Sequence, residues 1–116
     1  MVIGILSDTH GRVAIARAAV DELSAAGCEY FIHCGDVGST QVLDCLAGLP
    51  SVFVFGNTDY DAEELRRYGE SIGISCLGDG GELELDGKKL AVTHGHEPEV
   101  FRRLMAAEPD YLFTGH

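Results

Sequence analysis

Short continuous apolar runs alternate with amphipathic stretches along most of the chain. The runs predict strands at residues 2–6, 30–34, 51–55, 90–94 and 111–115. Because these runs are apolar at consecutive positions, we expect strands that are covered on both faces, as in a parallel sheet. Strands that alternate with helices in this way are typical of a layered α/β fold.

The stretch after the first strand predicts an amphipathic helix. Its apolar side chains recur at 3-4-3 spacing, at Val13, Ala16, Val20 and Leu23. This spacing places them on one face of a helix, which we expect to pack on the sheet. Gly27 follows at a position that favours a helix C-cap.

Two further helices are predicted from their end signals. One begins at Asp61, with Glu64 at capping-box spacing, and ends at Gly73. The other begins at Pro98, a residue that is favourable in a first helical turn, and stops before Pro109.

One segment has a different period. Residues 82–92 read ELELDGKKLAV, an alternating strand followed by Asp86-Gly87 and a return strand. This pattern predicts a β-hairpin with a two-residue turn. We expect the hairpin to add an antiparallel element to an otherwise parallel sheet.

Polar side chains follow each predicted strand at its carboxyl end. Asp8 and His10 follow the first strand, Asp36 the second, Asn57 and Asp59 the third, His94 and His96 the fourth, and His116 the last. The carboxyl ends of parallel strands share one edge of a sheet, so these residues are expected to converge there. Glycines next to them allow the chain to turn sharply.

Six of these residues, with carboxylate, amide and imidazole side chains, are candidate metal ligands. They are Asp8, His10, Asp36, Asn57, His94 and His116. Mixed oxygen and imidazole ligands suit Mn, Fe, Ni, Co or Zn. The set is too large for one tetrahedral site, and two ions bridged by a carboxylate would use it for phosphoryl chemistry.

Taken singly, each of these residues has another interpretation. Asp8 or Asp36 alone could cap a helix, and His10 or His94 alone could be a hydrogen-bonded structural histidine. Residues 57–59 could form a plain Asx-type turn. Residues of metal-ligand type follow all five predicted strands, and this repeated placement favours a metal site over separate explanations for each residue.

Composition and charge restrict the class of protein. With 116 residues, 46% of them hydrophobic and 23% charged, the chain has the makeup of one globular domain. A net charge of -11 argues against binding to nucleic-acid polymers. The sequence has no signal-peptide pattern, no membrane-length apolar run and no paired cysteine motif, which indicates a cytoplasmic protein without membrane attachment. The oligomeric state stays open, a homo-oligomer included.

Five short motifs in order identify a resemblance. They are DTH (8–10), GD (35–36), GNTD (56–59), HGH (94–96) and GH (115–116). Together they resemble the calcineurin-like metallophosphoesterase superfamily, and in particular its small bacterial and archaeal phosphodiesterases. The resemblance implies a layered α/β/β/α fold with a mostly parallel sheet plus a β-hairpin. It also implies hydrolysis of phosphodiesters, or alternatively phosphomonoesters, in small substrates by a water activated by two divalent ions, with manganese favoured.

The resemblance also implies a role for each candidate ligand. Asp8 and His10 would hold the first ion, Asp36 would bridge both ions, and Asn57, His94 and His116 would hold the second.

The sequence departs from the family pattern next to Asn57. Many members have a histidine there that protonates the leaving group, whereas this chain has Thr58, which cannot act as an acid near neutral pH. We therefore expect leaving groups that depart without a proton, such as aryl or nucleotide esters. Asp59 and His96 are the candidate catalytic residues, and the alternative for His96 is a solvated loop histidine.

A second departure is at the end of the chain. The family motif is G-H-x-H, and the sequence stops at the first of its two histidines, His116. We therefore expect residues 1–116 to be a single, C-terminally incomplete domain whose last strands are missing. Either the natural protein is longer, or one of its two metal sites is deficient.

Two other functions compete with the enzyme. The fold also resembles the retromer subunit that kept this architecture as a non-catalytic protein-binding scaffold, although a scaffold would be free to lose Asp8, His10 and His94. A flavodoxin-like nucleotide or regulator domain would explain the alternation of elements. It would leave His94 and His116 without a role, and the sequence has no glycine-rich nucleotide motif.

Overall fold

The computed structural model describes residues 1–115 and arranges their strands in two sheets. The first sheet is parallel, in the order β1-β2-β3-β4, with β1 (Ile3–Leu6), β2 (Tyr30–His33), β3 (Ser51–Phe53) and β4 (Ser75–Cys76). The second contains β5 (Gly80–Leu85), β6 (Lys88–Thr93) and β7 (Tyr111–Phe113). In it, β6 pairs antiparallel with β5 and parallel with β7.

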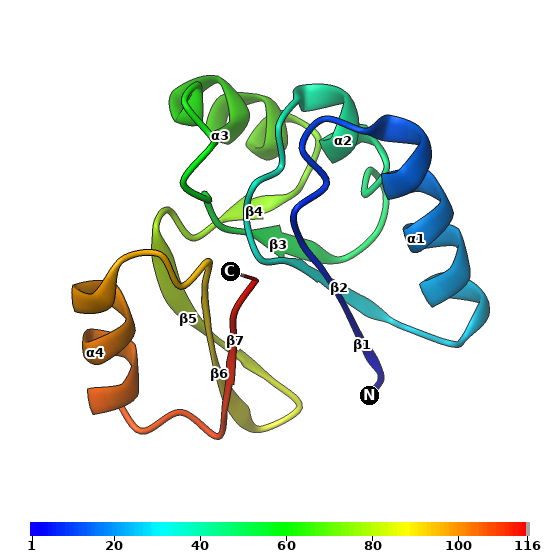
Figure 1. Cartoon of the computed structure of the whole chain (residues 1–116). Helices are drawn as coiled ribbons and strands as arrows, with labels where there is room; N and C mark the ends of the chain where they lie inside the picture. Colours follow the sequence, from blue (N-terminus) through cyan, green and yellow to red (C-terminus); the bar gives the residue numbers. More distant parts are fainter. Residues whose placement is uncertain (116) are drawn as a thin grey trace.

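Helices cover the outer face of each sheet. On the first sheet lie α1 (Val13–Ala25), α2 (Thr40–Asp44) and α3 (Ala62–Ser71), and on the second lies α4 (Pro98–Ala106), as Figure 1 shows. The inner faces of the two sheets pack against each other. The architecture is therefore the α/β/β/α sandwich that we predicted.

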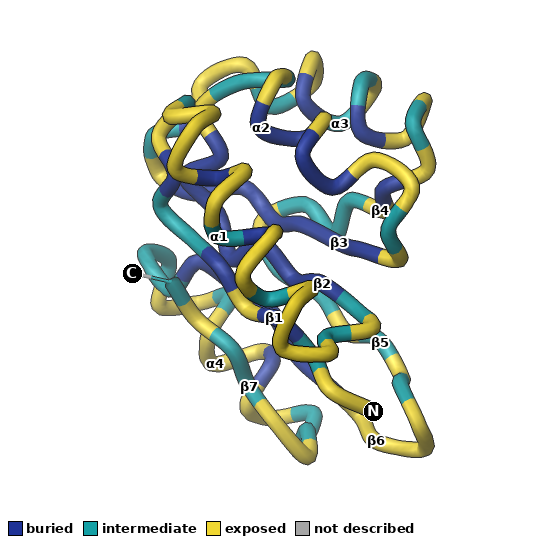
Figure 2. Tube along the Cα trace, turned by 90° about the vertical axis from the view of Figure 1, so that its right-hand side faces the viewer, coloured by how far each residue is buried: buried dark blue, intermediate teal, exposed yellow. Residues whose placement is uncertain are grey.

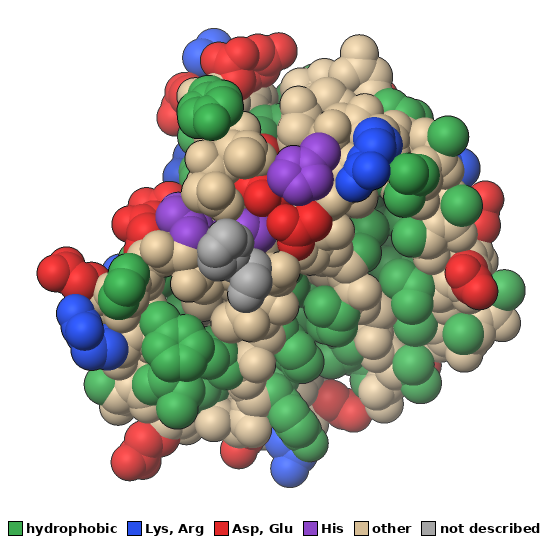
Figure 3. All heavy atoms as spheres, viewed as in Figure 1, with side chains coloured by type: hydrophobic (Ala, Val, Ile, Leu, Met, Phe, Trp, Pro, Cys, Tyr) green, Lys and Arg blue, Asp and Glu red, His purple; other side chains and the backbone are tan. Residues whose placement is uncertain are grey.

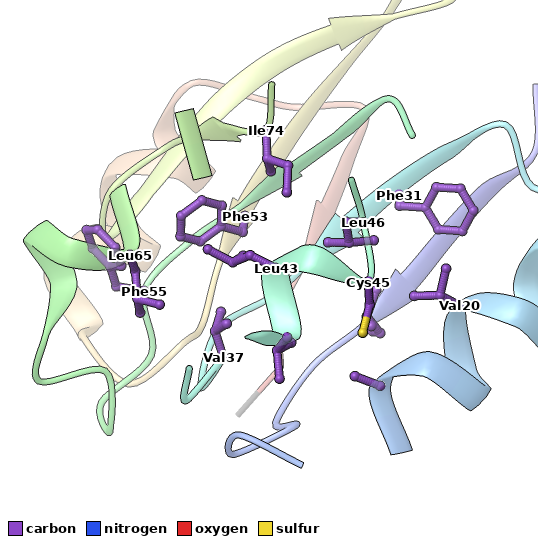
Figure 4. Close-up of a cluster of buried hydrophobic side chains, with 13 residues drawn as sticks. Val20, Phe31, Val37, Leu43, Cys45, Leu46, Phe53, Phe55, Leu65 and Ile74 are labelled. Atoms are coloured by element: carbon purple, nitrogen blue, oxygen red, sulfur yellow. The ribbon is translucent and has the colours of Figure 1, made fainter. Parts of the chain in front are cut away.

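The alternation of side chains along β2 and β3 explains their continuous apolarity. Phe31 and Phe53 belong to the cluster between the first sheet and its helices, which Figure 4 shows in close-up. Ile32 and Val52 point the other way and pack with Leu90 and other residues of the second sheet. Both faces of these strands are buried, so neither face needs polar residues.

The structure changes two of our predictions about the elements. The hairpin is formed, with Asp86 and Gly87 at φ values of 55° and 77° in its turn, but it lies in a separate second sheet and not in the parallel one. The helix α2 and the strand β4 were missed. Both are too short, at 5 and 2 residues, to show a hydrophobic period.

The helix ends follow the sequence signals only in part. Gly27 adopts a φ of 93° and its N–H donates to Ser24, so it ends α1 as predicted. Val13 is 40% exposed, in contrast to the buried Ala16 and Val20. Asp61 precedes α3, but its side chain makes no capping hydrogen bond, so the predicted capping box is wrong.

Burial decreases from the middle of the sandwich toward the hairpin. Figure 2 shows β2 and β3 largely buried, whereas the connection from β5 to β6 is exposed. Within residues 1–115, none of the helices has the length and apolarity needed to cross a bilayer.

Gly69 sets how closely α3 lies on the sheet. A Cβ atom at this position would lie 2.8 Å from Cε1 of Phe53, whose side chain is fully buried. We predict that Gly69→Ala lowers the free energy of unfolding by about 1–3 kcal/mol, although alanine is the better helix former. Urea denaturation measures this. The exposed Glu70→Ala in the same helix is the control, and stabilisation by Gly69→Ala would contradict the packing argument.

Candidate metal centre

The loops that follow β1 and β2 are joined by backbone hydrogen bonds. The N–H groups of Asp8, His10 and Gly11 donate to the carbonyls of Gly35, Asp36 and Val37, each over 2.9 Å. The two loops therefore run side by side beyond the ends of their strands. This arrangement brings the acidic and imidazole side chains of both loops to the same edge of the sheet.

The backbone is strained at three of the predicted ligands. Asp8, His10 and Asp36 have φ values of 56°, 47° and 56°, in the left-handed region that L residues rarely adopt. Each such residue costs about 1–3 kcal/mol, and strain of this kind is concentrated at functional sites. The loops therefore hold these side chains in positions that an unstrained chain would not favour.

The three side chains form one cluster. Asp8, His10 and Asp36 each offer a ligand atom, and these atoms all lie within 4.8 Å of one another. Nε2 of His10 is 3.7 Å from Oδ1 of Asp8 and 3.7 Å from Oδ2 of Asp36. Figure 3 shows histidine and acidic side chains grouped together on this face of the molecule.

His94 joins the cluster from the second sheet. Its side chain is fully buried, and Nδ1 lies 2.8 Å from the carbonyl oxygen of Cys34. A carbonyl only accepts, so Nδ1 carries the proton and donates it. Nε2 then faces the carboxylates, 3.3 Å from Oδ2 of Asp36 and 3.9 Å from Oδ1 of Asp8.

This geometry fits a cation. In the neutral imidazole, Nε2 of His94 is an acceptor that faces carboxylate oxygens, which are acceptors too. Such a contact becomes favourable when a positive charge lies among these atoms. A histidine that donates its other ring N–H to a backbone carbonyl is the usual arrangement for a metal ligand.

Asp36 lies at the centre of the cluster as an ionised carboxylate. Its side chain is only 4% exposed, and burial alone would raise the pKa of this carboxyl. The N–H of Thr58, which donates to Oδ1 over 2.9 Å, and the nearby His94 outweigh burial, so the pKa of Asp36 is lowered. Asp36 is therefore an ionised carboxylate that lies close to both His10 and His94.

Asp59 ties the loop after β3 to the loop after β2. Its Oδ2 accepts the N–H groups of Gly56 and Val37 over 2.8 and 3.1 Å, and its Oδ1 accepts the N–H of Gly38 over 3.0 Å. This use of both oxygens indicates a positioning role. Our prediction of Asp59 as a catalytic residue stays a prediction.

Two other predicted site residues, Asn57 and His96, are not among the residues of the Asp8, His10 and Asp36 cluster. Asn57 is exposed in the turn after β3, next to Thr58. The ring centre of His96 is 5.4 Å from that of His94, and Nε2 of His96 is 3.3 Å from Glu97 Oε1. His116 lies outside the described residues. The roles assigned to these three residues stay predictions.

Sequence reasoning missed two residues between the loops. His33 is fully buried in β2, with Nε2 3.0 Å from the hydroxyl oxygen of Thr9 and Nδ1 accepting the N–H of Gly35 over 3.1 Å. The hydroxyl of Thr9 donates to the carbonyl of Val37 over 2.9 Å. The signal was a polar residue inside the apolar run YFIHC, three positions before Asp36.

A cavity of about 400 Å³ borders the loops that follow β2 and β3. Its lining includes Ser39, Thr58, Tyr60 and Glu64. Thr58 also donates its backbone N–H to Asp36, but Asp8, His10, Asp36 and His94 do not line this cavity.

The three hydrogen bonds to Asp59 give a stability prediction. We expect Asp59→Ala to lower the free energy of unfolding by about 3 kcal/mol, because it leaves buried N–H groups without their charged acceptor. Urea denaturation measures the change. The matched control is Asp61→Ala, an exposed aspartate two residues along whose side chain makes no capping bond, and equal effects of the two variants would refute this role for Asp59.

His33 gives a prediction about pH. Burial lowers the pKa of His33 from 6.5 to about 4 in the folded protein. Between these values the unfolded chain binds a proton that the folded chain does not, so stability falls as the pH falls. The contribution of His33 is about 3 kcal/mol over this interval. From pH 6.5 to pH 4, wild type should therefore lose about 3 kcal/mol of unfolding free energy relative to His33→Gln, measured by urea denaturation, and a difference that does not change with pH would contradict the prediction.

Comparisons with known proteins agree with this geometry. The Calcineurin-like phosphoesterase superfamily domain matches residues 1–116. Phosphodiesterase MJ0936 of Methanocaldococcus jannaschii is 30% identical over 120 residues, which cover 100% of this chain and 72% of that protein. Probable metallophosphoesterase MJ0623 of the same organism is 42% identical over 127 residues, which cover 100% of this chain and 58% of that protein.

A solved structure shows the same arrangement of elements. The structure of a novel archaeal phosphodiesterase superimposes with a TM-score of 0.86 at 28% identity, over 98% of this chain and 72% of that one. The family match extends over all residues from 1 to 116. The chain therefore belongs to the calcineurin-like phosphoesterase superfamily.

Proposed function

We propose that this protein is a metal-dependent phosphoesterase that hydrolyses phosphodiester bonds, with phosphomonoesters as the alternative substrates. The proposal places two divalent ions at the cluster. Asp8 and His10 would hold one ion, Asp36 would bridge the two, and Asn57, His94 and His116 would hold the other. Manganese is the favoured metal, and nickel, iron, cobalt and zinc also suit this ligand set.

One observation carries the proposal. Oδ2 of Asp36 lies 3.7 Å from Nε2 of His10 and 3.3 Å from Nε2 of His94, so an imidazole from each sheet faces the same carboxylate. The family implies divalent metal ions, and one relative is named a phosphodiesterase. The geometry of the cluster and this relationship support the same chemistry.

Bound divalent ions supply a water of lowered pKa and neutralise charge on the phosphoryl oxygens. The protein's own groups have other tasks. Asp36 stays ionised because Thr58 donates to it, and the Cys34 carbonyl keeps the His94 ring in the tautomer that presents Nε2 to the cluster. The backbone bonds between the two loops hold Asp8 and His10 in place.

The substrate is proposed to be a small phosphate ester. The net charge of -11 repels nucleic-acid polymers. Thr58 stands where an acid would be needed, so we favour leaving groups that depart without a proton.

The convergence of Asp8, His10, Asp36 and His94 favours the enzyme over a protein-binding scaffold of the same fold. A scaffold has no need to keep strained backbone at candidate ligands. We also propose that the protein acts in the cytoplasm without membrane attachment, and its oligomeric state stays open.

The function is tested by removing the proposed bridging ligand. Wild-type protein with added Mn²⁺ should hydrolyse bis-p-nitrophenyl phosphate, and Asp36→Asn should reduce the rate by about 100-fold or more. This estimate is a lower bound, because loss of groups behind the ligands already costs about 10–100-fold. Release of p-nitrophenolate measures the rate.

Asp21→Asn is the matched control, since it removes the same charge from an exposed position on α1. It should leave the rate unchanged. Wild-type hydrolysis that persists after exhaustive chelation would refute the metal dependence. A rise in melting temperature with Mn²⁺ in wild type, absent in Asp36→Asn, would support metal binding independently of turnover.

A further inference from the structure

A buried chain of hydrogen bonds crosses from one ligand-bearing loop to the other. It runs from the Gly35 N–H to Nδ1 of His33, from Nε2 of His33 to the Thr9 hydroxyl, and from that hydroxyl to the Val37 carbonyl, with lengths of 3.1, 3.0 and 2.9 Å. His33 is fully buried and Thr9 is 4% exposed. None of the candidate metal ligands takes part in this series of hydrogen bonds through its side chain.

The partners fix the direction of every bond. The Gly35 N–H can only donate, so Nδ1 of His33 is the acceptor and a neutral ring must carry its proton on Nε2. Nε2 therefore donates to the Thr9 oxygen. The single proton of Thr9 is then used for the Val37 carbonyl, which can only accept. Each donor meets an acceptor, and only the Nε2–H tautomer allows this.

This series of hydrogen bonds lies between the two loops that carry the candidate ligands. Thr9 stands between Asp8 and His10, and Gly35 and Val37 flank Asp36. These three candidate ligands are the residues with φ values of 56°, 47° and 56°. The backbone bonds between the loops lie along their edges, and the side-chain bridge from His33 to Thr9 adds a link through the interior.

We propose that His33 and Thr9 are positioning residues that hold the Asp8–His10 loop against the Asp36 loop, and so set the geometry of the metal centre before an ion binds. The inference rests on the proposed function for its metal, but the coupling of the loops does not require one. Neither residue touches the substrate or the ions. Their effect passes through the backbone of the three ligands.

The test uses variants that keep or remove one bond at a time. Thr9→Val removes the hydroxyl at nearly constant shape, and Thr9→Ser keeps it. His33→Asn can still accept from Gly35 but is too short to reach Thr9, whereas His33→Gln extends an amide toward Thr9. Ser51→Ala is the control, because it removes another buried hydroxyl, which bonds Leu49 at the far end of β3.

Two measurements separate positioning from general stability. Manganese affinity is measured by the EPR signal of free Mn²⁺, and amide hydrogen exchange is measured in the metal-free protein at Asp8, His10 and Gly11. We expect Thr9→Val and His33→Asn each to weaken Mn²⁺ binding about tenfold and to speed exchange at these amides. Thr9→Ser, His33→Gln and Ser51→Ala should stay close to wild type.

The double variant Thr9→Val/His33→Asn provides the sharpest comparison. If the residues act as one bridge, it should weaken binding no more than the stronger single variant. Additive losses would overturn the proposal, as would a lower melting temperature with unchanged Mn²⁺ affinity and unchanged exchange. So would ¹⁵N NMR showing the proton of His33 on Nδ1.

Failure of the proposed function would appear differently. If wild-type protein does not bind Mn²⁺, the metal function falls, but the exchange rates of the metal-free variants still decide the coupling of the loops. Faster exchange at Asp8, His10 and Gly11 in Thr9→Val would then support the positioning role, and unchanged exchange would refute it.

Discussion

The parallel pairing of β1 with β2 is the interaction on which the centre depends. The register runs from Ile3 opposite Tyr30 to Leu6 opposite His33, so both strands end at the same level. The N–H of Cys34 then donates to Leu6, and bonds between residues 8–11 and 35–37 continue the pairing into the loops. Because the backbone hydrogen bonds continue beyond the strands, they keep Asp8, His10 and Asp36 in the left-handed conformation. A loop without such bonds would relax to an unstrained conformation.

His94 reaches the centre from the second sheet, and packing of the sandwich core places it. Ile32 and Val52 of the first sheet pack with Leu90 and Val92 of the second, which brings the end of β6 over the end of β2. His94 then reaches the Cys34 carbonyl, 60 positions away in sequence. A Cβ atom on Gly35 would lie 2.8 Å from Nδ1 of His94, so only glycine permits this approach.

The sequence predicted the convergence of ligands better than the details of the fold. Asp8, His10 and Asp36 meet because the ends of β1 and β2 share an edge, and this rule needs only the order of the elements. The rule did not predict that His94 comes from a second sheet, which core packing places against the first. The hairpin pattern predicted that β5 pairs with β6, but hydrophobic periodicity carries no information about which sheet a hairpin joins. The helix α2 was missed because 5 residues do not complete two helical turns.

Residues that serve the backbone were the hardest to predict. Asp59 has the residue type and position expected of a chemical group, yet its oxygens accept N–H groups from two loops, a use that depends on how those loops meet in space. His33, in contrast, was missed because it resembles an ordinary core residue. It lies within an apolar run, and nothing in its local pattern distinguishes a satisfied core histidine from one that links two functional loops.

Repulsion between the clustered carboxylates destabilises the folded state, and hydrogen bonds from neutral groups offset this cost. Two carboxylates, of Asp8 and Asp36, have oxygens within 4.8 Å, a repulsion of about 3 kcal/mol at an effective dielectric constant of about 20. Backbone N–H groups, the Thr9 hydroxyl and the neutral His33 ring hold them there, and none of these groups needs a cation to do so. An ion that binds this preformed cluster relieves the repulsion and orders little additional chain, so more of its interaction energy is expressed as affinity.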